Sequence, residues 1–174
     1  IDQRALPHQF LIEDLVSVDQ LYIAIKDMHL RGAGLIGAAA GYGMYLACLE
    51  ASKNGSFDSQ LKRSAEKIAS ARPTAINLSW AVNRQLMAIR KGHTVQEKIA
   101  ISLRTANDIA DEDVTCCRKI GEHGLQLIKD IQLKKKGSCV NILTHCNAGW
   151  LAFVDHGSAT SPMYAAFDEG INIH

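Results

Sequence analysis

The sequence predicts a mainly α-helical region followed by the first part of an α/β layer with a parallel sheet. Apolar residues recur at helical spacing from residue 17 to about residue 130, between recognisable cap and turn residues. After the lysine run at 134–136 the pattern changes to a short apolar run, a helical pattern and a second short apolar run. A strand–helix–strand order of this kind predicts parallel pairing with a right-handed crossover.

The composition is that of an ordinary globular protein. The chain has 174 residues, of which 47% are hydrophobic and 21% charged, and its formal net charge is +1. A net charge this small does not indicate binding to nucleic acid or to an anionic membrane. No apolar run approaches the ~20 residues of a membrane span, and the first residues lack the basic-then-apolar signature of a signal peptide. We therefore expect a cytoplasmic protein with neither a nucleic-acid nor a membrane partner.

The cysteines predict reduced thiols. There are five, an odd number, and none forms a C-x-x-C pair or a cluster with zinc-ligand spacing. Free thiols are the ordinary state of cysteine in a cytoplasmic protein.

The N-terminal part should contain one short β element and several helices. Residues 1–16 are mixed in character, with Pro7 closing a possible edge strand. The first helix should begin at a capping box formed by Ser17 and Gln20 and end at Arg31 and Gly32. An Ala- and Gly-rich helix should follow over about 36–53, although glycines weaken it.

Three further helical stretches are predicted before the lysine run. One covers about 59–71 and stops before Pro73, because proline disfavours helix in the residue that precedes it. Another starts at Thr74 and ends near Gly92. The last opens with a second capping box, Thr94 and Glu97, and should run with a break at 121–124 to about residue 130.

The end of the chain predicts a β-α-β unit. Residues 139–144 form a candidate buried strand, 149–169 a helix, and 170–174 the opening of a second strand. Two strands and one helix leave the faces and edges of a parallel layer uncovered. We therefore expect a helical N-terminal domain, 1–136, and an incomplete α/β domain, 137–174.

A first candidate site is the stretch Arg31-Gly32-Ala33-Gly34 before the second predicted helix. Free backbone N–H groups at a helix start, together with a guanidinium, suit an anion. A glycine turn with a solvated arginine explains the same residues, and on the residues alone this plainer interpretation is favoured.

A second candidate is Arg72-Pro73-Thr74, at the junction of two predicted helices. A Thr74 N-cap and the following N–H groups would join Arg72 in holding an anionic oxygen. An ordinary helix stop and restart is the alternative, and it is the favoured one without further information. Two arginines that each lie beside a helix start suggest a phosphorylated ligand.

The third candidate is Cys146, at the end of the predicted strand 139–144. In open α/β sheets ligands bind at the carboxyl ends of the strands, and a helix start nearby would favour a thiolate. A nucleophile or a general acid/base is one interpretation. The other is a small buried residue that only fills a core, since free cysteine is often buried.

Five segments together resemble the methylthioribose-1-phosphate isomerases, a family shared with ribose-1,5-bisphosphate isomerases and regulatory subunits of the exchange factor for eukaryotic initiation factor two. The resemblance spans the whole chain. Its segments are I-D-Q-R-A-L-P (1–7), R-G-A-G-L-I-G-A-A-A-G-Y-G (31–43), A-R-P-T-A-I-N-L-S-W-A (71–81), I-G-E-H-G (120–124) and I-L-T-H-C-N-A-G (142–149).

The resemblance implies a helical N-terminal domain, with a small β element at its start, joined to a Rossmann-like domain. It implies a homodimer in which neither a metal nor a nucleotide cofactor is used. The implied reaction converts 5-methylthioribose 1-phosphate into 5-methylthioribulose 1-phosphate in methionine salvage.

Carried over by motif, Cys146 resembles the catalytic thiol. Arg31, the backbone of Gly32 and Ala33, and Arg72 resemble the phosphate clamp. The resemblance places a catalytic Asp beyond residue 174, so residues 1–174 alone are expected to be inactive. Position 34 is Gly where the family usually has Pro, which implies a looser loop beside the clamp.

Two alternatives stay open. The same chemistry on ribose 1,5-bisphosphate or 5-deoxyribose 1-phosphate needs the same residues, because nothing in them fixes the group at C5. A non-catalytic regulatory subunit needs neither the thiol nor the clamp.

Overall fold

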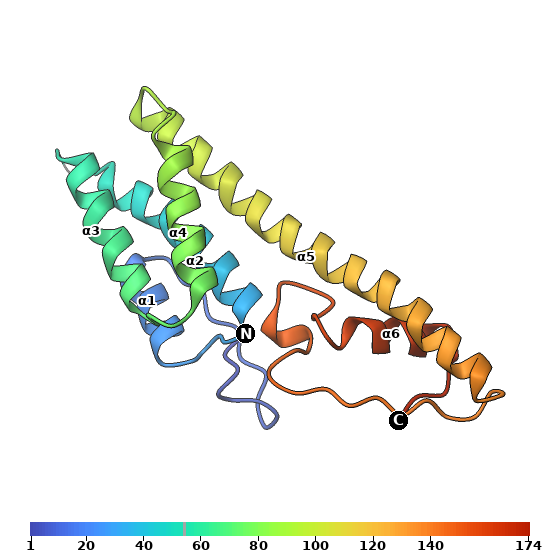
Figure 1. Ribbon diagram of the computed structural model, residues 1–174. Coiled ribbons are helices and arrows are strands. Elements are labelled where there is room, and N and C mark those ends of the chain that lie inside the picture. The colour runs from blue at the N-terminus through green and yellow to red at the C-terminus, as the bar shows by residue number, and fades with distance from the viewer. Residues whose placement is uncertain (54) are drawn as a thin grey trace. The chain divides into compact units, whose positions relative to one another are not determined.

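The computed structural model describes residues 1–53 and 55–174, and its regular elements are helices (Figure 1). They are α1 (Val18–Lys26), α2 (Ala33–Ala51), α3 (Phe57–Ser70), α4 (Ile76–Ile89), α5 (Val95–Lys134), the 3-10 helix η1 (Trp150–Ala152) and α6 (Ser161–Asp168). The chain divides into two compact units, Ile1–Asp111 and Glu112–His174, here called unit 1 and unit 2. Helix α5 contributes residues to both. The predicted domain boundary after residue 136 concerns the intact protein and stays a prediction.

The start of α1 is confirmed, whereas its predicted end is wrong. Ser17 is the N-cap, and its Oγ accepts a hydrogen bond of 3.2 Å from the Gln20 N–H. The helix ends at Lys26 rather than at Arg31, because Met28 takes a left-handed conformation with φ 59°. That conformation reverses the chain before α2.

The second capping box is also confirmed, and the predicted break in the last long helix is wrong. Thr94 Oγ1 accepts from the Glu97 N–H at 3.1 Å, and the Glu97 carboxylate accepts from the Thr94 N–H at 3.2 Å. Helix α5 then continues without interruption through residues 121–124. The glycines there serve packing, as described below, and do not end the helix.

Unit 1 is a helical bundle whose core draws on every helix from α1 to α4. Its largest fully buried side chains are Ile25 of α1, Met44 of α2, Ile68 of α3, and Leu78 and Ile89 of α4. Helix α2 contacts α1, α3 and α4, so it is the central element of the unit (Figure 1).

Helix α2 corrects one sequence expectation. It is 19 residues long and apolar enough, by length and composition, to cross a membrane, and no other helix in the described residues passes that test. Its alanines and glycines carry this apolar character, and residues such as Ala40, Met44 and Ala47 are fully buried against neighbouring helices. We interpret α2 as the core helix of unit 1.

In unit 2 the predicted strands are not formed. Within the described residues, the segments 139–144 and 170–174 share a single parallel bridge, Val140 to Ile173. Three backbone hydrogen bonds of 2.7–3.0 Å accompany it. Two short paired segments without further strands do not make a stable sheet, which explains the correction. The segments still contribute to a small core of Ile128, Val140, Ala166 and Ile171.

The predicted helix 149–169 is divided into η1 and the shorter α6. His156 and Gly157 have φ values of 66° and 69°, which no helix accommodates. Pro162 then lies in the first turn of α6, where proline suits a helix start.

The β element predicted in residues 1–16 is also absent from the described structure. These residues form turns, and they are attached to their surroundings by a few backbone hydrogen bonds, among them Asp2 N–H to Leu11 O at 2.9 Å.

Candidate functional site

Arg31, Gly32 and Ala33 lie directly at the start of α2. The helix begins at Ala33, three residues earlier than predicted, and Gly32 is its N-cap with φ 114°, a conformation that favours glycine. No side chain caps this end and no acidic residue lies in its first turn. Arg31 is exposed, and the described residues give it no hydrogen-bond or ion-pair partner. The turn thus presents a guanidinium beside uncapped backbone N–H groups.

Arg72 lies in the turn between α3 and α4. Its carbonyl accepts from the Ala75 N–H at 3.0 Å, and Ala75 is the N-cap of α4. The prediction that Thr74 caps this helix is wrong, because the N-cap falls one residue later. Ala75 offers no side-chain cap, so the first N–H groups of α4 are also uncapped.

The starts of α2 and α4 touch. A Cβ built on Gly37 would lie 3.3 Å from Asn77 Cβ and 3.4 Å from Asn77 O. Gly37 is in the first turns of α2, and Asn77 is the second residue of α4. The close approach therefore joins the two helix starts that follow Arg31 and Arg72, within unit 1.

Cys146 belongs to unit 2 and is exposed on a turn. Its φ is 78°, a left-handed conformation that costs a non-glycine residue roughly 1 kcal/mol. The predicted α-helix start next to it is absent, because only the 3-10 helix η1 follows. The exposed thiol is compatible with chemistry, and the core-filling interpretation of Cys146 does not fit its position.

The turn that carries Cys146 is held from its C-terminal side. The Cys146 carbonyl accepts from the Ala148 N–H at 3.1 Å. The Ala148 carbonyl in turn accepts from the Ser158 N–H and from Thr160 Oγ1, both at 2.9 Å. These bonds connect the thiol-bearing turn to the residues just before α6.

Glycines of α5 set the position of α6 in unit 2. A Cβ on Gly121 would lie 2.5 Å from Ser161 Oγ, and one on Gly124 would overlap the ring of Pro162, 2.7 Å from its Cβ. The two glycines are three residues apart and so share one face of α5. Gly121 and Gly124 thus form a notch in the surface of α5 that receives the first turn of α6. The two glycines of the G-E-H-G segment therefore serve packing.

Asp113 of α5 was missed in the sequence analysis, and its carboxylate holds the segment just after η1. Its carboxylate accepts from the Val154 N–H at 2.9 Å, and burial raises the pKa of Asp113 above its ordinary value. One turn further along α5, burial and the nearby Asp113 charge raise the pKa of the Cys117 thiol to about 11. The available signal was the i, i+4 pair of Asp113 and Cys117 on one face of α5.

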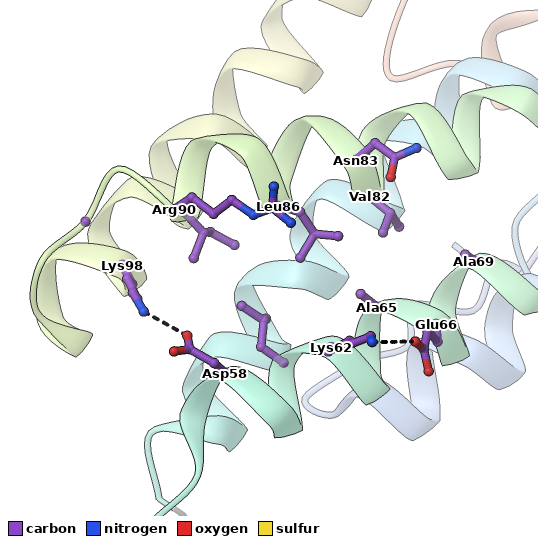
Figure 2. A pocket seen from close by; sticks show the side chains of 13 residues that line it. Asp58, Lys62, Ala65, Glu66, Ala69, Val82, Asn83, Leu86, Arg90 and Lys98 are labelled. Atoms are coloured by element: carbon purple, nitrogen blue, oxygen red, sulfur yellow. Dashed lines mark hydrogen bonds and ion pairs between the residues drawn. The ribbon is translucent and has the colours of Figure 1, made fainter.

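Unit 1 also contains a cleft of about 600 Å³ between α3 and α4 (Figure 2). Its floor is apolar, and its rim charges largely pair with each other. Lys98 lies 2.8 Å from Asp58, and Lys62 lies 4.0 Å from Glu66. The predicted site residues do not line it. The structure thus places four of the five predicted site residues in unit 1, at two touching helix starts, and the fifth in unit 2.

Comparison with known proteins gives a consistent result. The family model described as the initiation factor 2 subunit family matches residues 29–174. The methylthioribose-1-phosphate isomerase of Desulfosudis oleivorans is 47% identical over 174 residues, covering 100% of this chain and 47% of that protein. The protein of the same name from Desulfatibacillum aliphaticivorans is 49% identical with the same coverage. The chain spans about half the length of the curated relatives it matches.

Two solved structures share the fold. The crystal structure of 5-methylthioribose 1-phosphate isomerase from Pyrococcus horikoshii OT3 matches with a TM-score of 0.84 and 34% identity, covering 98% of this chain and 47% of that chain. The translation initiation factor eIF-2B subunit delta from A. fulgidus matches with a TM-score of 0.82 and 38% identity, covering 99% and 49%.

Proposed function

The chain belongs to the initiation factor 2 subunit family, and on that premise we propose that the intact protein is an aldose–ketose isomerase. It converts 5-methylthioribose 1-phosphate to 5-methylthioribulose 1-phosphate. The observation that carries this proposal is the identity of 47% and 49%, over the whole chain, to relatives named methylthioribose-1-phosphate isomerase.

The phosphate of the substrate is bound at the two helix starts of unit 1. Arg31 and Arg72 supply guanidinium groups that match phosphate oxygens bidentately. The backbone N–H groups of Gly32 and Ala33 supply further donors at the positive end of α2. The exposure of Arg31 and the uncapped starts of both helices support this assignment.

Cys146 is the catalytic thiol in this proposal. The substrate carries phosphate on its anomeric oxygen, so its ring does not open as a free hemiacetal. A proton must reach the ring oxygen as the bond from C1 to that oxygen breaks. Hydrogen then moves from C2 to C1, as a proton through an enediol-like state or as hydride, and the C2 hydroxyl loses its proton. The reaction is redox-neutral overall, so it needs no net oxidant or reductant. We propose neither a nucleotide nor a metal cofactor, because the family resemblance implies none.

The remaining features proposed for the intact protein are those that the family resemblance implies. We propose a helical domain over 1–136, a Rossmann-like domain that begins at 137, a homodimer and a cytoplasmic location. The parallel bridge between Val140 and Ile173 supports the second domain, since it has the direction of a β-α-β unit.

A regulatory subunit without catalytic activity is the second candidate. The likeness to eIF-2B subunit delta from A. fulgidus, at 38% identity, favours it. The presence of Arg31, Arg72 and Cys146 together argues against a regulatory subunit, because a non-catalytic scaffold needs none of them.

The test is a substitution of Cys146 in the intact protein. Cys146→Ala should lower kcat for 5-methylthioribose 1-phosphate by about a thousandfold or more, because a positioned acid/base or nucleophile contributes on that scale. Binding of inorganic phosphate should stay within about twofold, since the thiol is not part of the clamp. Cys116→Ala removes another exposed thiol and is the matched control.

Two results would contradict the proposal. Activity that survives in Cys146→Ala removes the role given to the thiol. An unmodified protein that turns over none of 5-methylthioribose 1-phosphate, 5-deoxyribose 1-phosphate and ribose 1,5-bisphosphate supports the regulatory candidate.

A further inference from the structure

The first sixteen residues contain buried polar groups that the proposed reaction does not use. Asp2 and Gln3 are 5% and 8% exposed, which is unusual for polar residues. The Asp2 carboxylate accepts from Arg4 Nε at 3.0 Å and from Arg4 Nη2 at 2.8 Å. This hydrogen-bonded pair lowers the pKa of Asp2 to about 2. The D-Q-R segment is therefore internally ordered.

Residues 1–16 bond to His29 from two sides, through Gln3 and through Glu13. The Gln3 N–H donates to the His29 carbonyl at 2.7 Å. His29 Nδ1 lies 2.6 Å from Glu13 Oε2, and the ring nitrogen is the donor because a carboxylate only accepts. The His29 side chain is 13% exposed, so this bond is partly shielded from water.

His29 lies two residues before Arg31, in the short connection between α1 and α2. The His29 N–H and the Leu30 N–H both bond to the Ala24 carbonyl, at 2.9 and 3.3 Å. On the far side of Arg31, Gly32 caps α2. Arg31 is thus exposed, whereas the residues on both sides of it are fixed.

The three side chains of Asp2, Glu13 and His29 have their polar atoms within 4.8 Å of one another, the spacing of a metal site. They carry no metal proposal. Asp2 is already bonded to Arg4, and the His29 nitrogen that would ligate is bonded to Glu13.

We infer that residues 1–16 form a strap that holds the Arg31 turn, with Glu13 and His29 as positioning residues for the phosphate clamp. The inference rests on the proposed function, which gives Arg31 its phosphate. The strap fixes the backbone from which the guanidinium extends, so the guanidinium loses less freedom when phosphate binds. This assigns a purpose to the I-D-Q-R-A-L-P segment, which contains no proposed site residue.

The experiment uses Glu13→Ala in the intact protein, because Glu13 is partly exposed and its loss should leave the fold intact. The KM for 5-methylthioribose 1-phosphate and the dissociation constant for inorganic phosphate should both rise about fivefold to twentyfold, with kcat within about twofold. Glu13→Gln retains an acceptor and should recover most of the affinity. Asp14→Ala removes the same charge one residue later, where the described chain gives that carboxylate no partner, and should change neither constant.

A double-mutant cycle separates positioning from general destabilisation. In an Arg31→Met background, Glu13→Ala should weaken phosphate binding no further. The reason is that Glu13 acts on phosphate only through the contact that Arg31 makes with it. Additive effects, or unchanged phosphate affinity in Glu13→Ala, would overturn the strap while leaving the isomerase proposal intact. An unmodified protein that neither binds phosphate nor isomerises the sugar would overturn both. An unmodified protein that binds phosphate without isomerising would overturn only the proposed function.

Discussion

Unit 1 and unit 2 both use glycine to bring helices close, but against different neighbours. In unit 1, a Cβ on Gly43 of α2 would overlap the end of the Leu21 side chain. In unit 2, a Cβ on Gly124 of α5 would overlap the ring of Pro162. A leucine side chain has other rotamers, whereas a proline ring in the first turn of a helix moves only with its backbone. The identity of the neighbour, rather than the distance, should decide what each glycine contributes.

Among the glycine substitutions, the largest expected effect on stability is that of Gly124→Ala. The added methyl forces α6 away from α5, and overpacking of this kind costs about 1–3 kcal/mol. Alanine returns about 1 kcal/mol of helix propensity, so we expect a net loss of up to about 2 kcal/mol. Hydrogen exchange of residues 157–168, measured by mass spectrometry on the intact protein, reports this local loss.

Gly55→Ala is the control, since apart from its chain neighbours no atom of the described residues lies within 4 Å of the added Cβ. It should change stability by no more than about 0.5 kcal/mol. Unchanged protection of α6 in Gly124→Ala would show that the notch does not fix that helix.

Gly43→Ala should have a smaller effect. Leu21 is buried, and it must change rotamer within a packed core, at a cost of about 1–2 kcal/mol. Helix propensity offsets about 1 kcal/mol of that cost, so the net loss should be at most about 1 kcal/mol. The midpoint of urea unfolding of the intact protein measures it. A loss larger than that of Gly124→Ala would reverse the comparison between the two units.

Gly37→Ala should leave stability almost unchanged and affect binding. The added Cβ lies 3.3 Å from Asn77 Cβ, so the starts of α2 and α4 must separate by a few tenths of an ångström. We expect about a threefold rise in the dissociation constant for inorganic phosphate, because small displacements of a clamp weaken it. Unchanged phosphate affinity would mean that the contact between the two helix starts does not position the clamp.

The smallest effect concerns Asp113 and is seen through pH. Burial raises its folded-state pKa, so the folded protein holds the proton more tightly than the unfolded chain. The wild type should therefore lose stability relative to Asp113→Asn as pH rises from the ordinary value near 3.8 through the raised value. The asparagine keeps an acceptor for the Val154 N–H. Unfolding midpoints of both proteins across pH 4–7 measure the difference, and parallel curves would contradict it.

The sequence predicted the helices of unit 1 well because their signals are local. Ser17 and Thr94 start helices through bonds to residues three positions away, and such bonds are visible as spacing. The same local reasoning misplaced the start of α4 by assigning the cap to Thr74. Thr74 and Ala75 are adjacent, and the spacing of the apolar residues does not fix a helix start to within one residue. Tertiary context decides which of the two is the N-cap.

The rest depended on long-range contacts. The strands predicted in 139–144 and 170–174 need pairing partners that no local pattern supplies. The break predicted at 121–124 was wrong because glycine within a helix also serves close packing, and only the position of Pro162 distinguishes the two uses. The motifs selected the candidate site residues, whereas the contact between Gly37 and Asn77 and the bond of His29 to Glu13 were not predictable from spacing.

At position 146 the stability of the protein and the presence of a thiol favour different residues. A glycine there would adopt φ 78° without strain and spare roughly 1 kcal/mol, yet it would delete the thiol. A library of variants sorted only for heat resistance should therefore accumulate glycine at this position, and under the proposed function those variants should lose turnover. Under the proposed function, the chain accepts this backbone strain at position 146 in exchange for the thiol.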